Sequence, residues 1–414
     1  MQSLLGVAFL LVLAIALSES RRHINWRIVG SAFALQAAVG GFVLFVPAGQ
    51  TLLATLAAGV NQLVGYADEG TRFMFGALAS DEMGFVVALR VLPVIVFVSS
   101  LVSVLYYLRL MPLLVTLLGG ALRALLGVTR VEGLAAAANV FVGMVEAPLA
   151  VRPYLASLTR PQFFCVLAGG LSSVTGAMLL AYAGLGVEIQ YLVAAAFMAA
   201  PGGILMAKLL VPDVPMDATG QAGVADANRG GADEPVAEVL GKPANVVEAA
   251  ADGAAAGLKI ALSVGAMLVA FIALLALANG LIGALGGWIG QPELSFDRIL
   301  GWLFAPVAFL MGIPWSESVI ADNLIGQKTI LNEFVAYVSF VGEKENLSAH
   351  AQAIMTFALC GFANLSALAI LMGGMATLLP QRKSEVARLG LKAVLAGTLS
   401  NLMSASLAGL FLSF

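Results

Sequence analysis

The sequence predicts an all-α polytopic membrane protein with about eight transmembrane helices, two re-entrant helical hairpins and broken helices, arranged in two structural repeats. Three features of the composition predict the class. Hydrophobic residues make up 60% of the 414 residues, charged residues make up 11%, and the mean hydropathy is +0.97. Because a soluble domain is roughly half apolar and a quarter charged, lipid must be the solvent for most of this chain.

Composition also excludes several kinds of partner. The net charge of −3 is too small to indicate binding to nucleic acid. Only two histidines are present, which excludes a multi-histidine metal site. Cys165 and Cys360 lie in apolar segments far apart in the sequence, so we expect two small buried side chains and no disulfide framework.

Most of the predicted elements are long apolar stretches. Those long enough to cross a bilayer cover 3–18, 28–47, 85–108, 164–184, 190–211, 258–283 and 390–413. Two further stretches, 50–66 and 297–312, mix polar residues and glycines with apolar residues and are typical of amphipathic interfacial helices.

Charged connectors predict the orientation of the chain. Positive charge follows the first apolar stretch, at 21–27, whereas a signal peptide carries its positive charge first, so we interpret 3–18 as a span. This connector and the basic cluster at 382–392 are both expected on the cytoplasmic side of the membrane. Both termini then lie on the extracytoplasmic side.

A hydrophilic segment rich in Pro, Gly, Asp and Asn divides the chain almost in half, and both halves repeat one order of elements. A span is followed by an interrupted segment with one central acid, then by a broken segment of small and polar residues, and finally by a turn marked by Pro201 or Pro380. Corresponding broken segments in two halves are typical of a transporter whose binding site lies near the bilayer midplane. The predicted units are 1–84 (scaffold helices and an interfacial helix), 85–211 (first repeat), 212–257 (hydrophilic loop) and 258–414 (second repeat).

Glu146 is the acid of the first interrupted segment and lies between Gly143 and Pro148. A re-entrant helical hairpin suits this sequence, because irregular backbone survives within a membrane only where protein or water surrounds it. A carboxylate at that depth is costly and is functional by default. The alternative is an ion pair with a basic residue such as Arg152.

Glu333 occupies the same place in the second half, between the short apolar arms 329–331 and 334–341. We again favour a functional carboxylate over an ion pair, for which the partner would be Lys328. Other polar side chains near the broken segments either bind a ligand, including a hard cation such as Na⁺, or form interhelical hydrogen bonds. They are Asn139, Ser172, Ser173, Thr175, Asn364 and Ser366.

Several strings in these segments carry a family resemblance. The strongest are Gly143-x-x-Glu146-Ala-Pro-x-x-x-Arg-Pro-Tyr154, Leu331-Asn-Glu-Phe-Val-Ala-Tyr337 and Cys360-Gly-Phe-Ala-Asn364. Others are Gly312-x-Pro-Trp-Ser-Glu317, Ile325-Gly-Gln-Lys328 and Leu399-Ser-Asn-Leu-Met403. Together they resemble the bacterial branch of the concentrative nucleoside transporters, over nearly the whole chain.

The resemblance implies an importer of nucleosides rather than an enzyme, located in the bacterial cytoplasmic (inner) membrane and needing no cofactor besides a coupling ion. Members of that family form homotrimers. Each protomer has a scaffold domain and a mobile transport domain, which carries the nucleoside across the membrane by an elevator-like movement. Na⁺ drives transport in many members and H⁺ drives it in others.

The resemblance also assigns roles to residues. Glu146 is similar to the acid at the tip of the first hairpin, on the nucleobase side, whereas Glu333 and Asn364 are similar to the pair that binds the ribose hydroxyls. The remaining substrate positions implied are Met144, Val145, Met178, Phe362 and Ala367. The sodium ligands of the family resemble Asn139, Val142, Ser173 and Val174, which favours Na⁺ over H⁺.

Three positions depart from the family pattern. The common string Gly-Gln-Thr-Glu is Gly143-Met144-Val145-Glu146 here, and Ala367 replaces a frequent serine. An unpaired polar edge of a base in an apolar pocket costs about 1–3 kcal/mol. We therefore expect a changed base preference, or weaker selection of pyrimidines.

Two other functions remain open from the sequence. One is H⁺-coupled import through Glu146 or Glu333. The other is an intramembrane enzyme that uses these two acids as a catalytic pair, although no Ser/His/Asp set, HExxH string or phosphate-binding glycine loop occurs in a suitable context. A channel would explain neither the broken segments nor the pair of Glu333 and Asn364.

Overall fold

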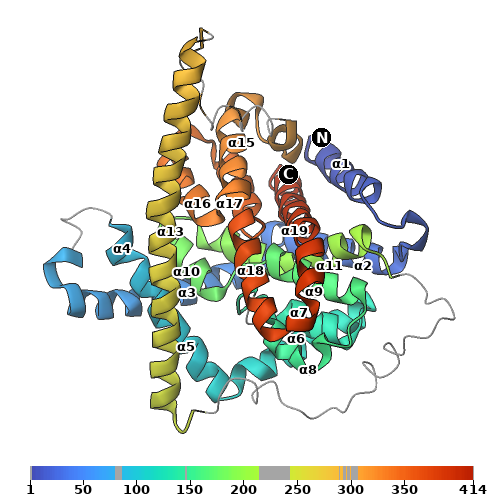
Figure 1. Ribbon diagram of the computed structural model, residues 1–414, viewed down its shortest axis with the longest axis horizontal. Coiled ribbons are helices and arrows are strands. Elements are labelled where there is room, and N and C mark those ends of the chain that lie inside the picture. Colours follow the sequence, from blue (N-terminus) through green and yellow to red (C-terminus); the bar gives the residue numbers. More distant parts are fainter. Residues whose placement is uncertain are drawn as a thin grey trace.

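The computed structural model describes residues 2–79, 86–144, 147–213, 243–288, 290–291, 295, 299 and 306–413. Throughout this part of the chain the regular structure is helical, without a β-strand, which confirms the predicted class (Figure 1). Five of the described segments are long and apolar enough to cross a membrane, and a sixth is counted if the pair of helices Leu92–Tyr107 and Leu110–Leu126, bent by 80°, is one span.

Most of the predicted spans coincide with observed helices. The predicted spans at 28–47, 190–211 and 390–413 correspond to α2 (Trp26–Phe45), α11 (Ile189–Leu210) and α19 (Lys383–Phe411). The first span is the shorter α1 (Gln2–Ala16), and 258–283 is the middle of α13 (Val246–Trp288), which runs over 43 residues.

Two predictions about element boundaries differ from the structure, and a third cannot be compared with it. The turn predicted at Pro201 is wrong, because this proline lies inside α11. A membrane helix tolerates proline where neighbouring helices satisfy the freed backbone groups, and α11 packs against α2, α9 (Arg160–Ser172) and α19. The stretch 50–66 is part of a longer helix, α3 (Pro47–Phe75), and most of 297–312 lies outside the described residues.

One side of the molecule is built from α3, α5 (Leu92–Tyr107) and α13. In Figure 1, α13 spans the full height of the view, α5 packs against α13, and α3 packs against α5. We call these three helices the α13 side. Large apolar side chains of α13 are exposed, among them Leu262, Val269, Leu274 and Leu277.

Small residues bring α5 and α13 close together. A Cβ atom added to Gly253 of α13 would lie 2.7 Å from the backbone oxygen of Ser99, and one added to Gly257 would lie 2.7 Å from the Cβ of Ser99. Ser100 Oγ donates a hydrogen bond of 2.8 Å to the backbone oxygen of Ala250. Close backbone contact through small residues is a common way to join helices in lipid.

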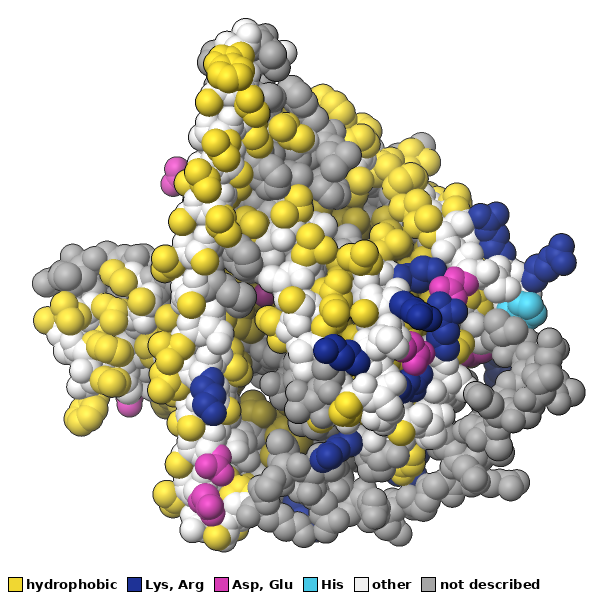
Figure 2. Space-filling view, viewed as in Figure 1, with side chains coloured by type: hydrophobic (Ala, Val, Ile, Leu, Met, Phe, Trp, Pro, Cys, Tyr) yellow, Lys and Arg dark blue, Asp and Glu magenta, His cyan; other side chains and the backbone are white. Residues whose placement is uncertain are grey.

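The rest of the molecule surrounds α19. The helices α1, α2, α9 and α11 pack against it or against one another. Both chain ends lie on the same side of this body in Figure 1. Basic side chains gather on the part of the surface in Figure 2 that is far from α13.

The predicted hairpins and broken helices are all present as short helices separated by turns or breaks. The first hairpin consists of α7 (Arg130–Ala138) followed by η4 (Ala147–Val151) and α8 (Arg152–Leu155), and the second consists of α15 (Trp315–Ile330) and α16 (Glu333–Gly342). The first broken helix consists of α9 and α10 (Gly176–Gly184), and the second consists of α17 (Ala349–Leu359) and α18 (Leu365–Leu378).

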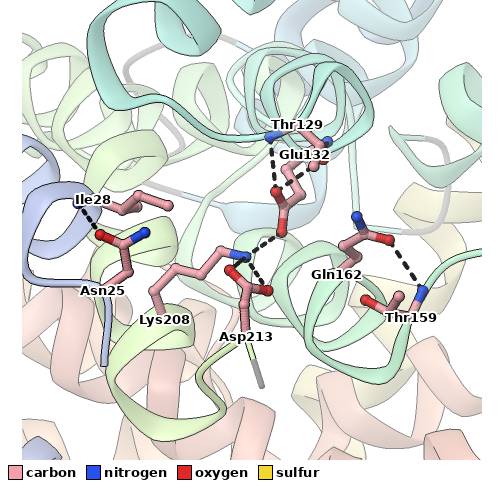
Figure 3. A network of polar contacts seen from close by, with 8 residues as sticks. All are labelled: Asn25, Ile28, Thr129, Glu132, Thr159, Gln162, Lys208 and Asp213. Atoms are coloured by element: carbon pink, nitrogen blue, oxygen red, sulfur yellow. Dashed lines mark hydrogen bonds and ion pairs between the residues drawn. The ribbon is translucent and has the colours of Figure 1, made fainter. Parts of the chain in front are cut away.

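A buried ion pair joins the first hairpin to α11. Lys208 Nζ lies 2.6 Å from Glu132 Oε1 and 2.7 Å from Asp213 Oδ2 (Figure 3). The other oxygen of Glu132 accepts a hydrogen bond of 3.0 Å from the backbone nitrogen of Thr129, which completes a capping box at the start of α7. The first hairpin is thereby fixed to the body of the molecule at its outer end.

Candidate functional site

The buried polar side chains of Glu333, Tyr182 and Asn364 come from three elements and are joined by hydrogen bonds. Tyr182 of α10 donates its hydroxyl to Glu333 Oε1 at 2.9 Å, and Asn364 Nδ2 donates to Glu333 Oε2 at 2.7 Å. Glu333 is 5% exposed, and Asn364 and Tyr182 are fully buried. The structure therefore joins the second hairpin to both broken helices through one carboxylate.

Local sequence explains why these side chains point toward one another. Asn332 caps α16 by accepting from the backbone nitrogen of Val335 at 2.8 Å, so Glu333 is the first residue of that helix. Asn364 caps α18 by accepting from the backbone nitrogen of Ala367 at 2.7 Å, which leaves its amide nitrogen for Glu333. Asparagine is a preferred N-cap residue, and a negative charge is stabilised at a helix N-terminus.

Aromatic rings of α10 and α16 pack together beside Glu333. The rings of Tyr182 and Tyr337 have centroids 4.4 Å apart, and the Tyr182 and Phe334 rings have centroids 5.9 Å apart. The Tyr337 hydroxyl donates to the backbone oxygen of Thr356 at 2.8 Å. The Tyr182 hydroxyl that donates to Glu333 is therefore held within a cluster of packed aromatic rings.

The two helix breaks touch each other directly. The first break runs from Ser173 to Thr175, and Thr175 caps α10 by accepting from the backbone nitrogen of Met178 at 3.0 Å. In the second break, the backbone nitrogen of Phe362 donates to the backbone oxygen of Ser173 at 3.1 Å. The breaks of the two repeats therefore form one continuous region of unwound backbone.

Asn139 lies at the start of the turn of the first hairpin and has an unusual environment. Its side chain is 1% exposed, yet within the described part of the chain neither its amide oxygen nor its amide nitrogen has a hydrogen-bond partner. It faces α9, because a Cβ atom added to Gly170 would lie 3.6 Å from Asn139 Oδ1. A buried amide of this kind is costly unless it binds a ligand.

The other predicted cation residues are buried near the same end of α9. Ser173 follows the last residue of α9, and its hydroxyl donates to the backbone oxygen of Gly170 at 3.3 Å. Val142 and Val174, which the family resemblance places among the sodium ligands, are also buried. Oxygen donors of amide, hydroxyl and carbonyl groups are ligands that suit a hard cation.

The predicted substrate positions are partly described. Met144 is buried and packs on α9, because a Cβ atom on Gly170 would lie 3.0 Å from the Cβ of Met144. Met178, Phe362 and Ala367 are buried beside the two breaks. Val145 and Glu146 lie outside the described residues, so their predicted roles stay predictions.

Lys328 does not form the ion pair that the sequence left open. In the described part of the chain no ion pair joins it to Glu333, and its Nζ instead donates to the backbone oxygen of Ala358 and to Asn401 Oδ1, each at 2.7 Å. Sequence reasoning did not identify Asn401, Tyr182 or the pair of Lys208 and Glu132. Each is a polar residue in an apolar segment, and this pattern could have singled it out. Its partner could not be predicted, because the two residues are far apart in the sequence.

Two broken helices that meet at a buried carboxylate, together with two hairpins in an apolar helical bundle, are typical of a membrane transporter. Comparison with known proteins assigns the family. Models described as Na⁺-dependent nucleoside transporter N-terminus, nucleoside recognition and Na⁺-dependent nucleoside transporter C-terminus match residues 5–78, 88–188 and 191–409. The chain belongs to the Na⁺-dependent nucleoside transporter family, which comprises transporters rather than enzymes.

Individual relatives match over the whole chain. An uncharacterised transporter of Haemophilus influenzae is 46% identical over 420 residues, covering 100% of this chain and 98% of that protein. The nucleoside permease NupC of Helicobacter pylori is 46% identical, covering 99% of this chain and 97% of the permease. The sodium/nucleoside cotransporter 1 of Mus musculus is 35% identical over 99% of this chain and 63% of its own length.

Solved structures show the same fold. CNTnw in an inward-facing, substrate-bound state has a TM-score of 0.92 and 48% sequence identity, and the match covers 100% of this chain and 97% of that chain. A variant of CNTnw in an outward-facing state has a TM-score of 0.91 and 48% identity, with the same coverage. The broken helices and hairpins described above are therefore features of a known transporter fold.

Proposed function

We propose that this protein is a Na⁺-coupled symporter that imports nucleosides. The observation that carries the proposal is the buried Glu333 carboxylate, held by Asn364 and Tyr182 where the two helix breaks meet. A ribose diol offers hydroxyl donors that a carboxylate accepts in strong, charge-assisted hydrogen bonds. The amide of Asn364 both donates and accepts, so it suits a hydroxyl as well. The names of the relatives, nucleoside permease and sodium/nucleoside cotransporter, support this substrate class.

The unpartnered amide of Asn139 supports Na⁺ as the coupling ion. We infer that Asn139 and Ser173 bind the cation through side-chain oxygens, and that Val142 and Val174 bind it through backbone carbonyls. Cation binding would satisfy the Asn139 oxygen, which has no other partner in the described chain. Because the same break carries Ser173 and touches Phe362, a bound cation favours the geometry that receives the nucleoside.

We infer an elevator-type mechanism in which a mobile body that contains the hairpins and the broken helices moves against a scaffold. Structures of CNTnw in inward-facing, outward-facing and intermediate states support it. In this division α3, α5 and α13 belong to the scaffold, whereas the hairpins and broken helices belong to the mobile body. The exposed apolar side chains of α13 suit contact with lipid or with further copies of the chain in a homotrimer.

We further propose a multi-pass protein of the bacterial inner membrane with both termini outside the cytoplasm. Reporter fusions test the orientation, because alkaline phosphatase fused at the C-terminus is active only outside the cytoplasm. An active cytoplasmic fluorescent reporter at that end would contradict the orientation.

Native mass spectrometry in mild detergent tests the homotrimer, and a monomeric species alone would contradict it.

Ion-dependent uptake into proteoliposomes tests the function. A panel of radiolabelled nucleosides is supplied under an inward Na⁺ gradient, and Na⁺ is replaced by choline at constant pH as the control. We expect accumulation with Na⁺ and little with choline. Uptake that persists in choline and follows a pH gradient would indicate H⁺ coupling, and recovery of a chemically altered nucleoside would indicate an enzyme.

A further inference from the structure

A second buried polar cluster joins the elements that carry the nucleoside site. Its members are Lys328 of α15 and Asn401 of α19. Lys328 Nζ donates to the backbone oxygen of Ala358 and to Asn401 Oδ1, each at 2.7 Å. Asn401 Nδ2 in turn donates to the backbone oxygens of Ser172, at 2.7 Å, and Cys360, at 2.9 Å. Four hydrogen bonds thus link the second hairpin, both broken helices and α19.

The acceptors in this cluster are backbone oxygens at the ends of interrupted helices. Ser172 is the last residue of α9, Ala358 lies in the last turn of α17, and Cys360 follows that helix. Such carbonyls have no partner within their own helix, and within a membrane they must be satisfied by other groups. One ammonium group and one amide perform this task for both repeats.

The fit around Asn401 is tight. Lys328 and Asn401 are each 2% exposed. A Cβ atom added to Gly361 would overlap the side chain of Asn401, so the second break needs glycine there to let the amide reach Cys360. The cluster is therefore a specific arrangement of the two breaks around one side chain of α19.

Lys328 also has an electrostatic relation to Glu333. It forms no ion pair with any carboxylate in the described part of the chain, but Lys328 lies in the last turn of α15 and Glu333 is the first residue of α16, the helix that packs against α15 in the second hairpin. A buried charge costs several kcal/mol unless an opposite charge offsets it. A Lys328 ammonium and a Glu333 carboxylate would together offset each other's charge in this buried region.

We propose that Lys328 and Asn401 are positioning residues of the nucleoside site. Asn401 fixes the two helix breaks and the second hairpin relative to one another, and Lys328 serves as the counter-ion that makes a buried carboxylate at Glu333 available to the sugar hydroxyls. Neither residue needs to touch the nucleoside. The inference rests on the proposed function, because it assigns a role at the same site.

A double-mutant cycle tests the role of Lys328. The variants are Lys328→Met, Glu333→Gln and the two combined, and the measurement is the KM for uridine and for 2′,3′-dideoxyuridine in proteoliposomes. We expect Lys328→Met to raise the KM for uridine about tenfold when Glu333 is present and by less than about twofold in Glu333→Gln, because residues that act through one another are not additive. The KM for the dideoxy analogue should change little.

Further variants separate positioning from folding. Lys328→Gln keeps a hydrogen-bond donor and removes the charge, so it should also raise the KM for uridine. Asn401→Ala should do the same, whereas Ser400→Ala is the matched control on the same helix, because the buried Ser400 hydroxyl has no partner in the described chain. Nucleoside-induced thermal stabilisation of the purified variants supplies a second measurement that does not depend on reconstitution.

Two results would overturn the inference. One is an equal rise of KM for uridine and the dideoxy analogue in Lys328→Met, and the other is the same fold-change with and without Glu333. Either would indicate a purely structural lysine. Failure of the unmodified protein to take up any nucleoside would instead overturn the proposed function, so the two failures are distinguishable.

Discussion

At the residue scale, the positions of Glu333 and Asn364 explain how two polar side chains can be buried together in an apolar bundle. Each lies at the N-terminal end of a helix, where unsatisfied backbone amides favour a negative charge or a capping oxygen. Asn364 uses one side-chain atom as a cap and the other as a donor to Glu333. The cost of burial is thus partly offset before any ligand arrives.

Glu333→Gln should sharply weaken the transport of ribonucleosides. A hydrogen bond to a charged group contributes about 1.5–3 kcal/mol, so we expect the KM for uridine to rise about 10-fold to 100-fold. Tyr182→Phe is the matched comparison, because it removes a single donor to the same carboxylate and should have a smaller effect. Normal uridine uptake by Glu333→Gln would exclude this carboxylate from the ribose site.

Met144→Gln combined with Val145→Thr should alter the ranking of bases. These changes restore polar side chains at positions where the family pattern has them, and a new hydrogen bond to a base edge contributes about 0.5–1.5 kcal/mol. The test is competition of labelled uridine uptake by a panel of unlabelled purine and pyrimidine nucleosides. An unchanged ranking would mean that neither position contacts the base.

At the element scale, the sequence predicts the hairpins and breaks well, because glycines, prolines and central acids interrupt otherwise apolar segments. The long spans also follow directly from hydropathy. Pro201 is the exception. A proline usually breaks a helix in water, but α11 continues through Pro201 because packed neighbouring helices surround it. In the structure, α13 begins before the predicted span 258–283, where polar residues and small residues take the place of an apolar run.

Side-chain partners could not be predicted in the same way. Tyr182 and Glu333 are 151 positions apart in the sequence, and Lys328 and Asn401 are 73 positions apart. Only the packing of the two repeats brings them together. The family resemblance supplied the roles of Glu333 and Asn364 but not the residues that support them. Local patterns therefore locate the breaks, whereas tertiary contacts determine what surrounds them.

The contact between α5 and α13 should be sensitive to a single methyl group. Gly253→Ala and Gly257→Ala place a Cβ atom 2.7–2.8 Å from the backbone of α5, and overpacking of this kind costs about 1–3 kcal/mol. We expect a lower melting temperature in detergent for both variants. Gly280→Ala on the same helix is the control, because no neighbouring group in the described part of the chain lies within 4 Å of its added Cβ. Equal melting temperatures for all three variants would contradict the close packing.

At the scale of the whole molecule, the contacts within the body around α19 differ in kind from the contacts between α10 and the α13 side. The body around α19 is held by buried polar groups, including the pair of Lys208 and Glu132 and the bonds of Asn401. Where α10 meets the α13 side, the contacts are apolar and come from Ala67, Val94, Val98 and Leu180. Apolar contacts without directional bonds offer little resistance to sliding, whereas the polar groups keep the body rigid.

Cross-linking between the two parts should therefore stop transport. Cysteines at Val98 of α5 and Leu180 of α10, in a background where the native Cys165 and Cys360 are replaced by alanine, allow the apolar contact to be fixed by a short bifunctional reagent. We expect uptake of uridine to fall to background after the reaction and to return when a cleavable linker is cut, because an elevator cannot move while tied to its scaffold.

The control pair joins α5 and α13 within the scaffold, at Ser100 and Ala250, where the Ser100 side chain already donates a hydrogen bond of 2.8 Å to the Ala250 backbone. That cross-link should leave uptake intact. Full transport by the protein cross-linked between α5 and α10 would show that these helices do not move past each other, and the division into scaffold and mobile body would have to be drawn elsewhere.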